Sequence, residues 1–199
     1  MGEDSTGHDW FHVERVRKNA LYIWKREQVG NPFIIEMSAL LHDVPDEKLN
    51  GSQEEGQRIL LQFLSQLELS SEEIGQIMEV INSISFRGGE KKNLTSWEAK
   101  IVQDADRLDA IGAIGIARAF AYGGKKGQPI YNPDVEVRKK MTVEEYRNGK
   151  SSSINHFYEK LLLLKELLNT ETAKSMAETR HRYMEEFLSQ FYQEWNGQA

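Results

Sequence analysis

The chain has 199 residues, of which 31 are acidic and 25 basic, so its formal net charge is −6 at pH 7. This length is most simply one domain, large enough to bury roughly two-thirds of the surface of the unfolded chain. The chain has no cysteine, which excludes disulfides and thiolate metal sites. The acidic balance disfavours extended nucleic acid as a partner, because binding a phosphate backbone requires a basic face.

No early apolar segment resembles a signal peptide, and no apolar run reaches the length of about 18 residues that a membrane span requires. The longest apolar block, residues 161–164, is far shorter. We therefore expect a cytoplasmic protein with no membrane partner. The absence of cysteine is compatible with a reducing compartment.

Apolar residues spaced three and four apart predict helices along most of the chain, and strand patterns are almost absent. The first helix is predicted over residues 9–28. Asn31-Pro32 then predicts a cap followed by proline at the first position of a second helix. The second helix is expected to end at His42-Asp43, just before a proline that breaks it.

Three capping-box patterns, each a hydroxyl residue followed three positions later by glutamate, predict the starts of three more helices. The pairs are Ser52 with Glu55, Ser70 with Glu73, and Thr95 with Glu98. The last of these helices is predicted to run over residues 96–120. Its many alanines and glycines allow close approach of neighbouring helices, so we expect it to be the central helix.

Residues 121–134 contain glycine and proline and predict an irregular segment, which is long for a connection within a compact domain. As a lid, this segment would bring Lys125, Lys126 and Tyr131 over a bound anion. As a surface insertion, it would leave the same side chains in solvent.

The C-terminal part predicts two long helices, over residues 153–168 and 171–195, with Asn169-Thr170 as the cap between them. The expected fold is all-α: a single domain over residues 1–199 with seven or eight helices. The long exposed C-terminal helices also favour a homodimer.

Two histidines and two aspartates occur where they could surround one divalent cation. His42 and Asp43 are adjacent, and adjacent helical residues point about 100° apart, so both can face one ion only at a helix end or distortion. His12 lies at the edge of the apolar face of the first helix. The competing interpretation is structural: His12 is a core or surface histidine, His42 interacts with the carbonyl end of its helix, and Asp43 solvates the break.

The segment QDADRLD places three acids in the predicted central helix, at Asp104, Asp106 and Asp109. Asp106 and Asp109 share one helical face, whereas Asp104 lies roughly 200° away from Asp106. An arginine such as Arg107 or Arg118 is the expected structural partner of whichever acid is not a metal ligand.

Asp46 and Glu47 follow the His-Asp pair closely and are candidates to orient or deprotonate a metal-bound water, whose pKa the metal would lower. Their structural alternative is the acidic first turn of a short helix. Arg15, one turn after His12, is a candidate to bind phosphate oxygens. Further candidates for that role are Lys48, His156 and Lys160. Trp10, Trp24 and Tyr122 could stack on a base, with packing in the core or at a rim as the alternative for each.

The segments HVERV (12–16), ALLHDVPDEK (39–48) and IVQDADRLDAIGAIGIAR (101–118) resemble, in this order, the HD-domain metal-dependent phosphohydrolases. The resemblance extends to INHFYEKL (154–161). It implies an all-α HD-domain bundle that binds one divalent metal ion per chain through His12, His42, Asp43 and Asp106. Asp106 is chosen because related sequences place the last ligand in the ADRL segment. Asp46 and Glu47 match two acids that assist catalysis in HD hydrolases of guanosine polyphosphates.

Among HD proteins, the chain is most similar to small bacterial proteins of the nucleotide pyrophosphohydrolase type. That resemblance implies cleavage of a nucleoside triphosphate to a monophosphate and pyrophosphate. Manganese is favoured because carboxylates with open coordination positions suit it, and Fe²⁺, Ni²⁺, Co²⁺, Zn²⁺ and Mg²⁺ remain open. The alternatives are a phosphomonoesterase or nucleotidase acting on another phosphate ester, a nucleotide-binding sensor whose metal is structural, and a helical scaffold.

The chain departs from the family pattern in two ways. No histidine lies between positions 43 and 155, so a mononuclear site is expected instead of the dinuclear site of some HD enzymes. Relatives also carry a helix before the GHDW motif, which here occupies residues 7–10, so a shortened N-terminus is a further expectation.

Overall fold

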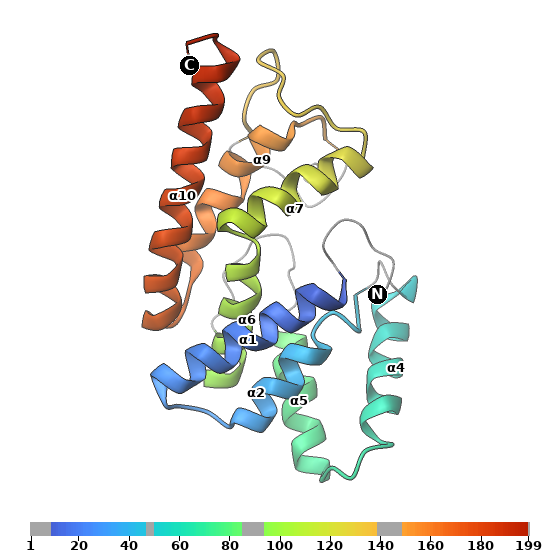
Figure 1. The fold of residues 1–199 in the computed structure, drawn as a ribbon. Coiled ribbons are helices and arrows are strands. Elements are labelled where there is room, and N and C mark those ends of the chain that lie inside the picture. Colours follow the sequence, from blue (N-terminus) through green and yellow to red (C-terminus); the bar gives the residue numbers. More distant parts are fainter. Residues whose placement is uncertain (1–8, 47–49, 85–93, 139–148, 199) are drawn as a thin grey trace.

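A computed structural model describes residues 9–46, 50–84, 94–138 and 149–198. Within these ranges the chain forms eight α-helices and one 3₁₀ helix, with no strand, which confirms the all-α prediction (Figure 1). The elements are α1 (Trp10–Glu27), α2 (Pro32–Leu41), α4 (Gln53–Leu64), α5 (Ser71–Ile84), α6 (Trp97–Asp109), α7 (Gly112–Lys125), α9 (Ser153–Glu159), η1 (Leu161–Leu167) and α10 (Glu171–Trp195).

Helix α1 packs against both α6 and α2, and α5 packs on the other side of α2 and α6. Helices α7, α9 and α10 form the upper half of the molecule as drawn in Figure 1, and α10 reaches down to contact α1 and α6. The buried apolar side chains form one cluster that extends from α1 to α10. The junction between the two halves, where α1, α2 and α6 meet, is where the candidate site lies.

The predicted central helix over residues 96–120 is in fact two helices, so that prediction was wrong. α6 ends at Asp109 and α7 begins at Gly112, whose backbone φ is 76°. This left-handed conformation favours glycine, and a Cβ at this position would lie 3.0 Å from the Arg180 side chain. The chain therefore turns at Gly112, and α7 leaves the axis of α6 to lie against α10.

The predicted irregular segment 121–134 was wrong in its first part, because α7 continues to Lys125. Gly123 is buried inside this helix, and a Cβ there would collide with Ser153 at the start of α9. The glycine thus permits a close helix contact instead of ending the helix. Further along, Tyr131 packs edge-on against Trp195, with ring centroids 5.0 Å apart, which holds this part of the segment against α10.

One of the three predicted capping boxes is confirmed in full, because Ser70 and Glu73 bond to each other reciprocally. Ser52 caps α4 as predicted by accepting a hydrogen bond from the backbone N–H of Glu55, but the Glu55 carboxylate accepts from Arg58 and does not close the box. The third prediction was wrong, because Ser96 caps α6 in place of Thr95. Glu98 does not close that box: its Oε1 accepts from the backbone N–H of Asn31 at 2.8 Å. It therefore joins the start of α6 to the start of α2.

At the C-terminal end, the helix predicted over residues 153–168 is instead α9 followed by η1, with the break at Lys160. The second predicted helix is confirmed as α10, and Thr170 caps it as expected. The break makes Lys160 the C-cap residue of α9, directly before η1.

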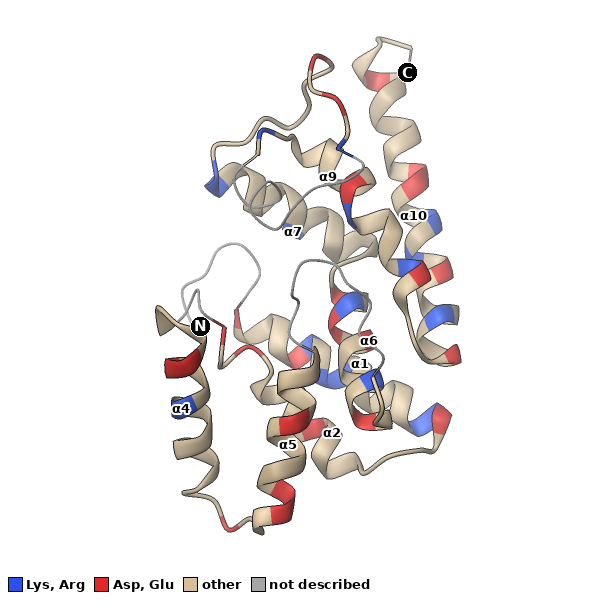
Figure 2. Ribbon diagram, turned by 180° about the vertical axis from the view of Figure 1, so that it is seen from behind, with Lys and Arg blue, Asp and Glu red and all other residues tan. Residues whose placement is uncertain are grey.

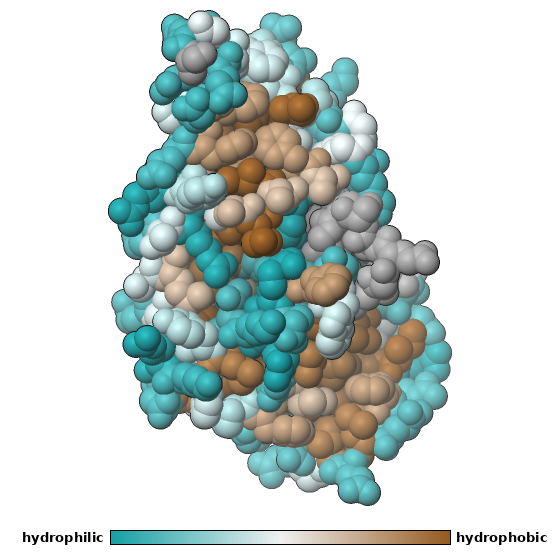
Figure 3. Space-filling model, in the orientation of Figure 1, coloured by the Kyte–Doolittle hydropathy of each residue, from teal (hydrophilic) through white to brown (hydrophobic). Residues whose placement is uncertain are grey.

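The charged residues do not separate into one basic and one acidic face. Figure 2 shows basic and acidic positions interspersed along α10, whereas α5 carries only acidic ones. Apolar surface gathers in two places on the face drawn in Figure 3, over α7 and beside α4. None of the described helices is long and apolar enough to cross a membrane.

Candidate metal centre

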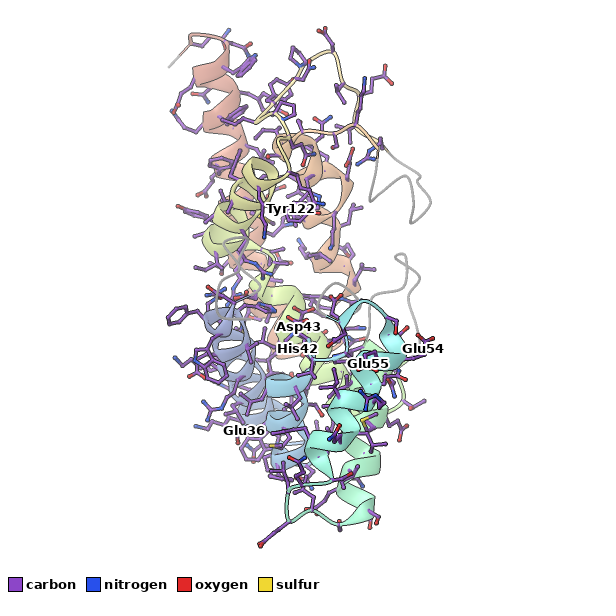
Figure 4. The ribbon with its side chains drawn as sticks, turned by 90° about the vertical axis from the view of Figure 1, so that its right-hand side faces the viewer. Glu36, His42, Asp43, Glu54, Glu55 and Tyr122 are labelled. Atoms are coloured by element: carbon purple, nitrogen blue, oxygen red, sulfur yellow. The ribbon has the colours of Figure 1, made fainter. Side chains whose placement is uncertain are left out.

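The structure brings His12, His42, Asp43 and Asp106 to one point. His12 Nε2 lies 3.4 Å from Asp43 Oδ2 and 3.6 Å from Asp106 Oδ1. His42 Nε2 lies 3.3 Å from Asp43 Oδ1 and 3.9 Å from Asp106 Oδ1. One nitrogen of each imidazole and both carboxylates therefore enclose a common position. Figure 4 shows His42 and Asp43 at the junction of the two halves of the molecule, with Tyr122 of α7 above them.

The end of α2 explains how two adjacent residues face the same point. His42 is the C-cap residue, and its Nδ1 donates to the carbonyl oxygen of Ala39 at 2.8 Å. This bond satisfies the carbonyl end of the helix and leaves Nε2 directed at the cluster. The structural role considered for His42 is thus compatible with metal binding, since each ring nitrogen serves one purpose.

Asp109 orients the other imidazole and was not among the predicted site residues. His12 is only 1% exposed, and its Nδ1 lies 2.7 Å from Asp109 Oδ2. Asp109 also accepts from Arg15 Nε and from Arg118 Nη1, each at 2.6 Å. A carboxylate on one ring nitrogen fixes the tautomer that leaves the other nitrogen available to a metal. The sequence feature that could have indicated this role is the helical face that Asp109 shares with Asp106.

The acids around His12 dominate its electrostatics. Burial disfavours the imidazolium, but hydrogen bonds to Asp109 and Asp43 and the charge of Asp106 outweigh it and raise the pKa of His12 to about 9. Burial also opposes the charge of Asp109, yet His12, Arg15 and Arg118 hold the pKa of that carboxyl well below its usual range. The cluster therefore favours positive charge at its centre, and a bound metal would release the proton of His12.

The donor atoms fit a divalent transition metal. Nε2 of His42 is buried and makes no hydrogen bond to any residue within the described ranges, an arrangement that is costly unless another partner binds it. Ligand atoms of His12, His42 and Asp43 all lie within 4.8 Å of one another. Asp106, with its side chain 47% exposed, completes the set at the open edge. Two imidazoles with two carboxylates suit Mn²⁺ or its neighbours better than Mg²⁺.

The other predicted site residues lie around this centre to different extents. Asp46 follows directly in the turn after α2, where its backbone N–H donates to the carbonyl of Asp43 at 3.1 Å. Glu47 and Lys48 fall outside the described residues. Arg15 is close, but its guanidinium binds Asp109 on the far side of His12 from the metal position.

His156 and Lys160 approach from the upper half of the molecule. Burial lowers the pKa of Lys160, while the charge of Asp106 acts in the opposite direction, so Lys160 is near enough to this acid to interact with it electrostatically. Tyr122 is among the groups that act on Lys160 electrostatically. Burial, followed by the charge of Lys160, lowers the pKa of His156 to about 4, so this imidazole is neutral at pH 7.

Asp104 has a different role, as its helical position predicted. It is fully buried, and its carboxylate accepts from the backbone N–H groups of Asn169 and Thr170 and from the Thr170 hydroxyl. It therefore holds the start of α10. The expected arginine partner of a non-ligand acid is found for Asp109, which pairs with Arg118. Arg107 instead donates to the carbonyl of Leu167.

The chain belongs to the HD domain family, whose model matches residues 10–111, the segment that contains all four converging residues. This makes it an HD-superfamily phosphohydrolase of the metal-dependent class. A Bacillus thuringiensis protein described as an HD-superfamily hydrolase is 48% identical, with a TM-score of 0.76 over 98% of this chain and 89% of that one.

Two further solved structures are similar over nearly the whole chain. A protein of Lactobacillus plantarum is 39% identical, with a TM-score of 0.85 over 99% of this chain and 92% of that chain. YpgQ of Bacillus subtilis, solved in complex with ADP, is 36% identical, with a TM-score of 0.79 over 98% of this chain and 94% of that chain.

Proposed function

We propose that the protein hydrolyses a nucleoside triphosphate to a nucleoside monophosphate and pyrophosphate, with one Mn²⁺ ion bound by His12, His42, Asp43 and Asp106. The convergence of these four side chains on one position carries the proposal. The ADP bound in the structure of YpgQ supports a nucleotide as the substrate.

A divalent ion at this centre supplies positive charge for phosphate oxygens and acidifies a water molecule. Attack of water on the α-phosphorus would break the bond from this phosphorus to the bridging oxygen and release pyrophosphate. Asp46 accepts the proton of the attacking water, with Glu47 as the second acid of the pair. The Asp109–His12 hydrogen bond keeps the imidazole in its binding tautomer throughout.

Charge on the transferred group is stabilised by cations on the rim. Lys160 lies near Asp106 at the end of α9, where it can donate to phosphate oxygens. Tyr122 is 41% exposed on α7, where it can stack on the base. His156 and Lys48 complete the proposed substrate contacts, and Arg15 acts on the site through Asp109, which orients His12. We also propose that the protein is cytoplasmic and forms a homodimer. Size-exclusion chromatography with light scattering tests the homodimer by measuring the molar mass.

Product analysis tests the proposal directly. The parent chain and its Asp43→Asn variant are incubated with Mn²⁺ and a panel of ribo- and deoxynucleoside triphosphates, and the products are separated by ion-exchange chromatography. Monophosphate with pyrophosphate is expected from the parent and not from Asp43→Asn. Asp134→Asn, on an exposed turn, is the matched control and should behave as the parent.

The other outcomes redirect the assignment. Release of inorganic phosphate alone would make the protein a phosphomonoesterase or nucleotidase. Turnover by metal-free Asp43→Asn would remove the metal mechanism. Stabilisation by nucleotide with no product after hours would favour a nucleotide-binding sensor whose metal is structural.

A further inference from the structure

A second concave site lies on the opposite side of His12 from the metal position. It is a cavity of about 380 Å³, walled by α1, by the junction of α6 and α7, and by α10. Asp109 contributes to its wall and binds Nδ1 of His12, whereas the metal position faces Nε2 of the same ring. The cavity is therefore separate from the metal centre but shares one hydrogen bond with it. Its volume is in the range of small-ligand sites, which begin at roughly 300 Å³.

Three cations surround this cavity against a single carboxylate. Arg15 and Lys18 come from successive turns of α1 and Arg180 comes from α10, with Asp109 as the only acid in the wall as described. Lys18 is 69% exposed and reaches Glu14 at 3.3 Å, and Arg15 is 32% exposed although it binds Asp109. In a chain with a net charge of −6, such a concentration of positive charge in a concavity favours an anion. Guanidinium groups match the geometry of phosphate oxygens in particular.

The rest of the wall is Asn19 of α1 and an apolar stretch at the start of α7. Ile114 and Ala113 are the exposed apolar residues of this stretch, Ile114 being 44% exposed, whereas Ile111 is only 1% exposed and belongs to the core beneath. Ile111 is also the N-cap of α7 and provides no side-chain hydrogen bond to the first turn. A ligand that fills the cavity would therefore place charge beside the cations and an apolar part against Ala113 and Ile114.

We propose that this cavity binds the phosphate group of a small organic phosphate, independently of the metal centre. The phosphate lies between Lys18 and the two arginines, and the organic part packs against Ala113 and Ile114. Because Arg15 binds Asp109, an anion that binds Arg15 competes with the carboxylate that orients His12. A ligand in this cavity could therefore alter the orientation of His12 through Arg15 and Asp109.

Isothermal titration of the full-length chain with phenyl phosphate, in the presence of a chelator, tests the proposal without any contribution from a metal ion. A Lys18→Gln substitution removes one charge and should weaken binding about tenfold. Ala113→Phe introduces a bulky ring at the cavity wall and should abolish binding without changing the charge. Lys25→Gln, on the same helix away from the cavity, is the matched control and should bind as the parent. Circular dichroism confirms that each variant folds.

A second titration, with inorganic phosphate, separates the organic phosphate from the free ion. Weaker binding of inorganic phosphate than of phenyl phosphate supports the apolar part of the site, and equal binding overturns it. Absence of binding, equal losses in Lys18→Gln and Lys25→Gln, or binding that requires Mn²⁺ each overturns the proposal. These results do not depend on nucleotide hydrolysis, so failure here is distinguishable from failure of the proposed function.

Discussion

His12 and Asp109 are joined by a hydrogen bond of 2.7 Å between Nδ1 and Oδ2, which links α1 to α6 across 97 positions of the chain. Asp109 is itself held by two arginines, so the imidazole is fixed in position before any metal binds. Metal affinity should therefore depend on a residue that does not touch the metal.

Replacing Asp109 with asparagine keeps the side-chain shape but removes the charge that His12, Arg15 and Arg118 share. We expect the affinity for Mn²⁺ to fall by about 10- to 100-fold, as for other partners of metal-binding histidines. Isothermal titration with Mn²⁺ measures this. Asp104→Asn is the matched control: it removes a buried carboxylate from the same helix and should lower the free energy of unfolding by about 1–3 kcal/mol. Equal affinity losses in both variants would contradict a specific role for Asp109.

Metal binding should stabilise the fold, because the four donors converge only in the folded chain. At a free Mn²⁺ concentration about 100 times Kd, the gain is about 2.7 kcal/mol, or roughly 5–10 °C in Tm for a chain of this size. Thermal unfolding with and without chelator measures the shift. Asp43→Asn should remove it, and a shift that persists in this variant would place the metal elsewhere.

Lys160 should contribute to turnover more than to stability. Lys160→Gln removes the ammonium near Asp106, and we expect kcat/KM for the nucleotide to fall by about 10- to 100-fold. Lys165→Gln is the control, because Lys165 lies five residues beyond the break at Lys160 and forms a salt bridge with Glu178. Steady-state kinetics compares the two. An equal kcat/KM for the two variants would contradict a role of Lys160 in substrate binding.

His156 predicts how stability depends on pH. Its pKa of about 4 in the folded chain lies below the ordinary value of 6.5, so between these values the unfolded chain binds more protons. Its contribution to stability is complete above pH 6.5 and is lost as the pH falls towards 4, with a total of at most about 3 kcal/mol. Urea unfolding from pH 4 to pH 7.5 measures the slope. His156→Gln should flatten it, and an unchanged slope would assign the dependence to other groups.

The sequence predicted the four converging residues because each lies in a short motif whose order is characteristic of the family. His42 and Asp43 are adjacent, and Asp106 occurs in a distinctive acidic segment. Asp109 shares that segment, but its role depends on a contact with α1 that no local pattern reveals. For Asp104, the sequence predicted only that it does not share the helical face of Asp106. Its structural role depends on Asn169 and Thr170, which follow η1 far along the chain.

The errors in the predicted elements have a similar origin. The small residues of segment 96–120 have helical spacing on both sides of Gly112, so only its positive φ and its packing against Arg180 show where the chain turns. In the opposite sense, Gly123 looked like a helix breaker but permits contact with Ser153. In each case a tertiary contact, absent from the local pattern, decides what the glycine does.

The start of α6 distinguishes two adjacent hydroxyl residues. Ser96 accepts from the backbone N–H of Ala99 at 3.1 Å, whereas Thr95 is exposed and precedes the cap. Ser96→Ala should therefore lower the free energy of unfolding by about 1 kcal/mol, and Thr95→Ala should change it by only a few tenths of a kcal/mol. Urea unfolding at pH 7 compares the variants. If Thr95→Ala were the more destabilising, the capping box read from Thr95 and Glu98 would be restored, and the Glu98–Asn31 link between α6 and α2 would lose its support.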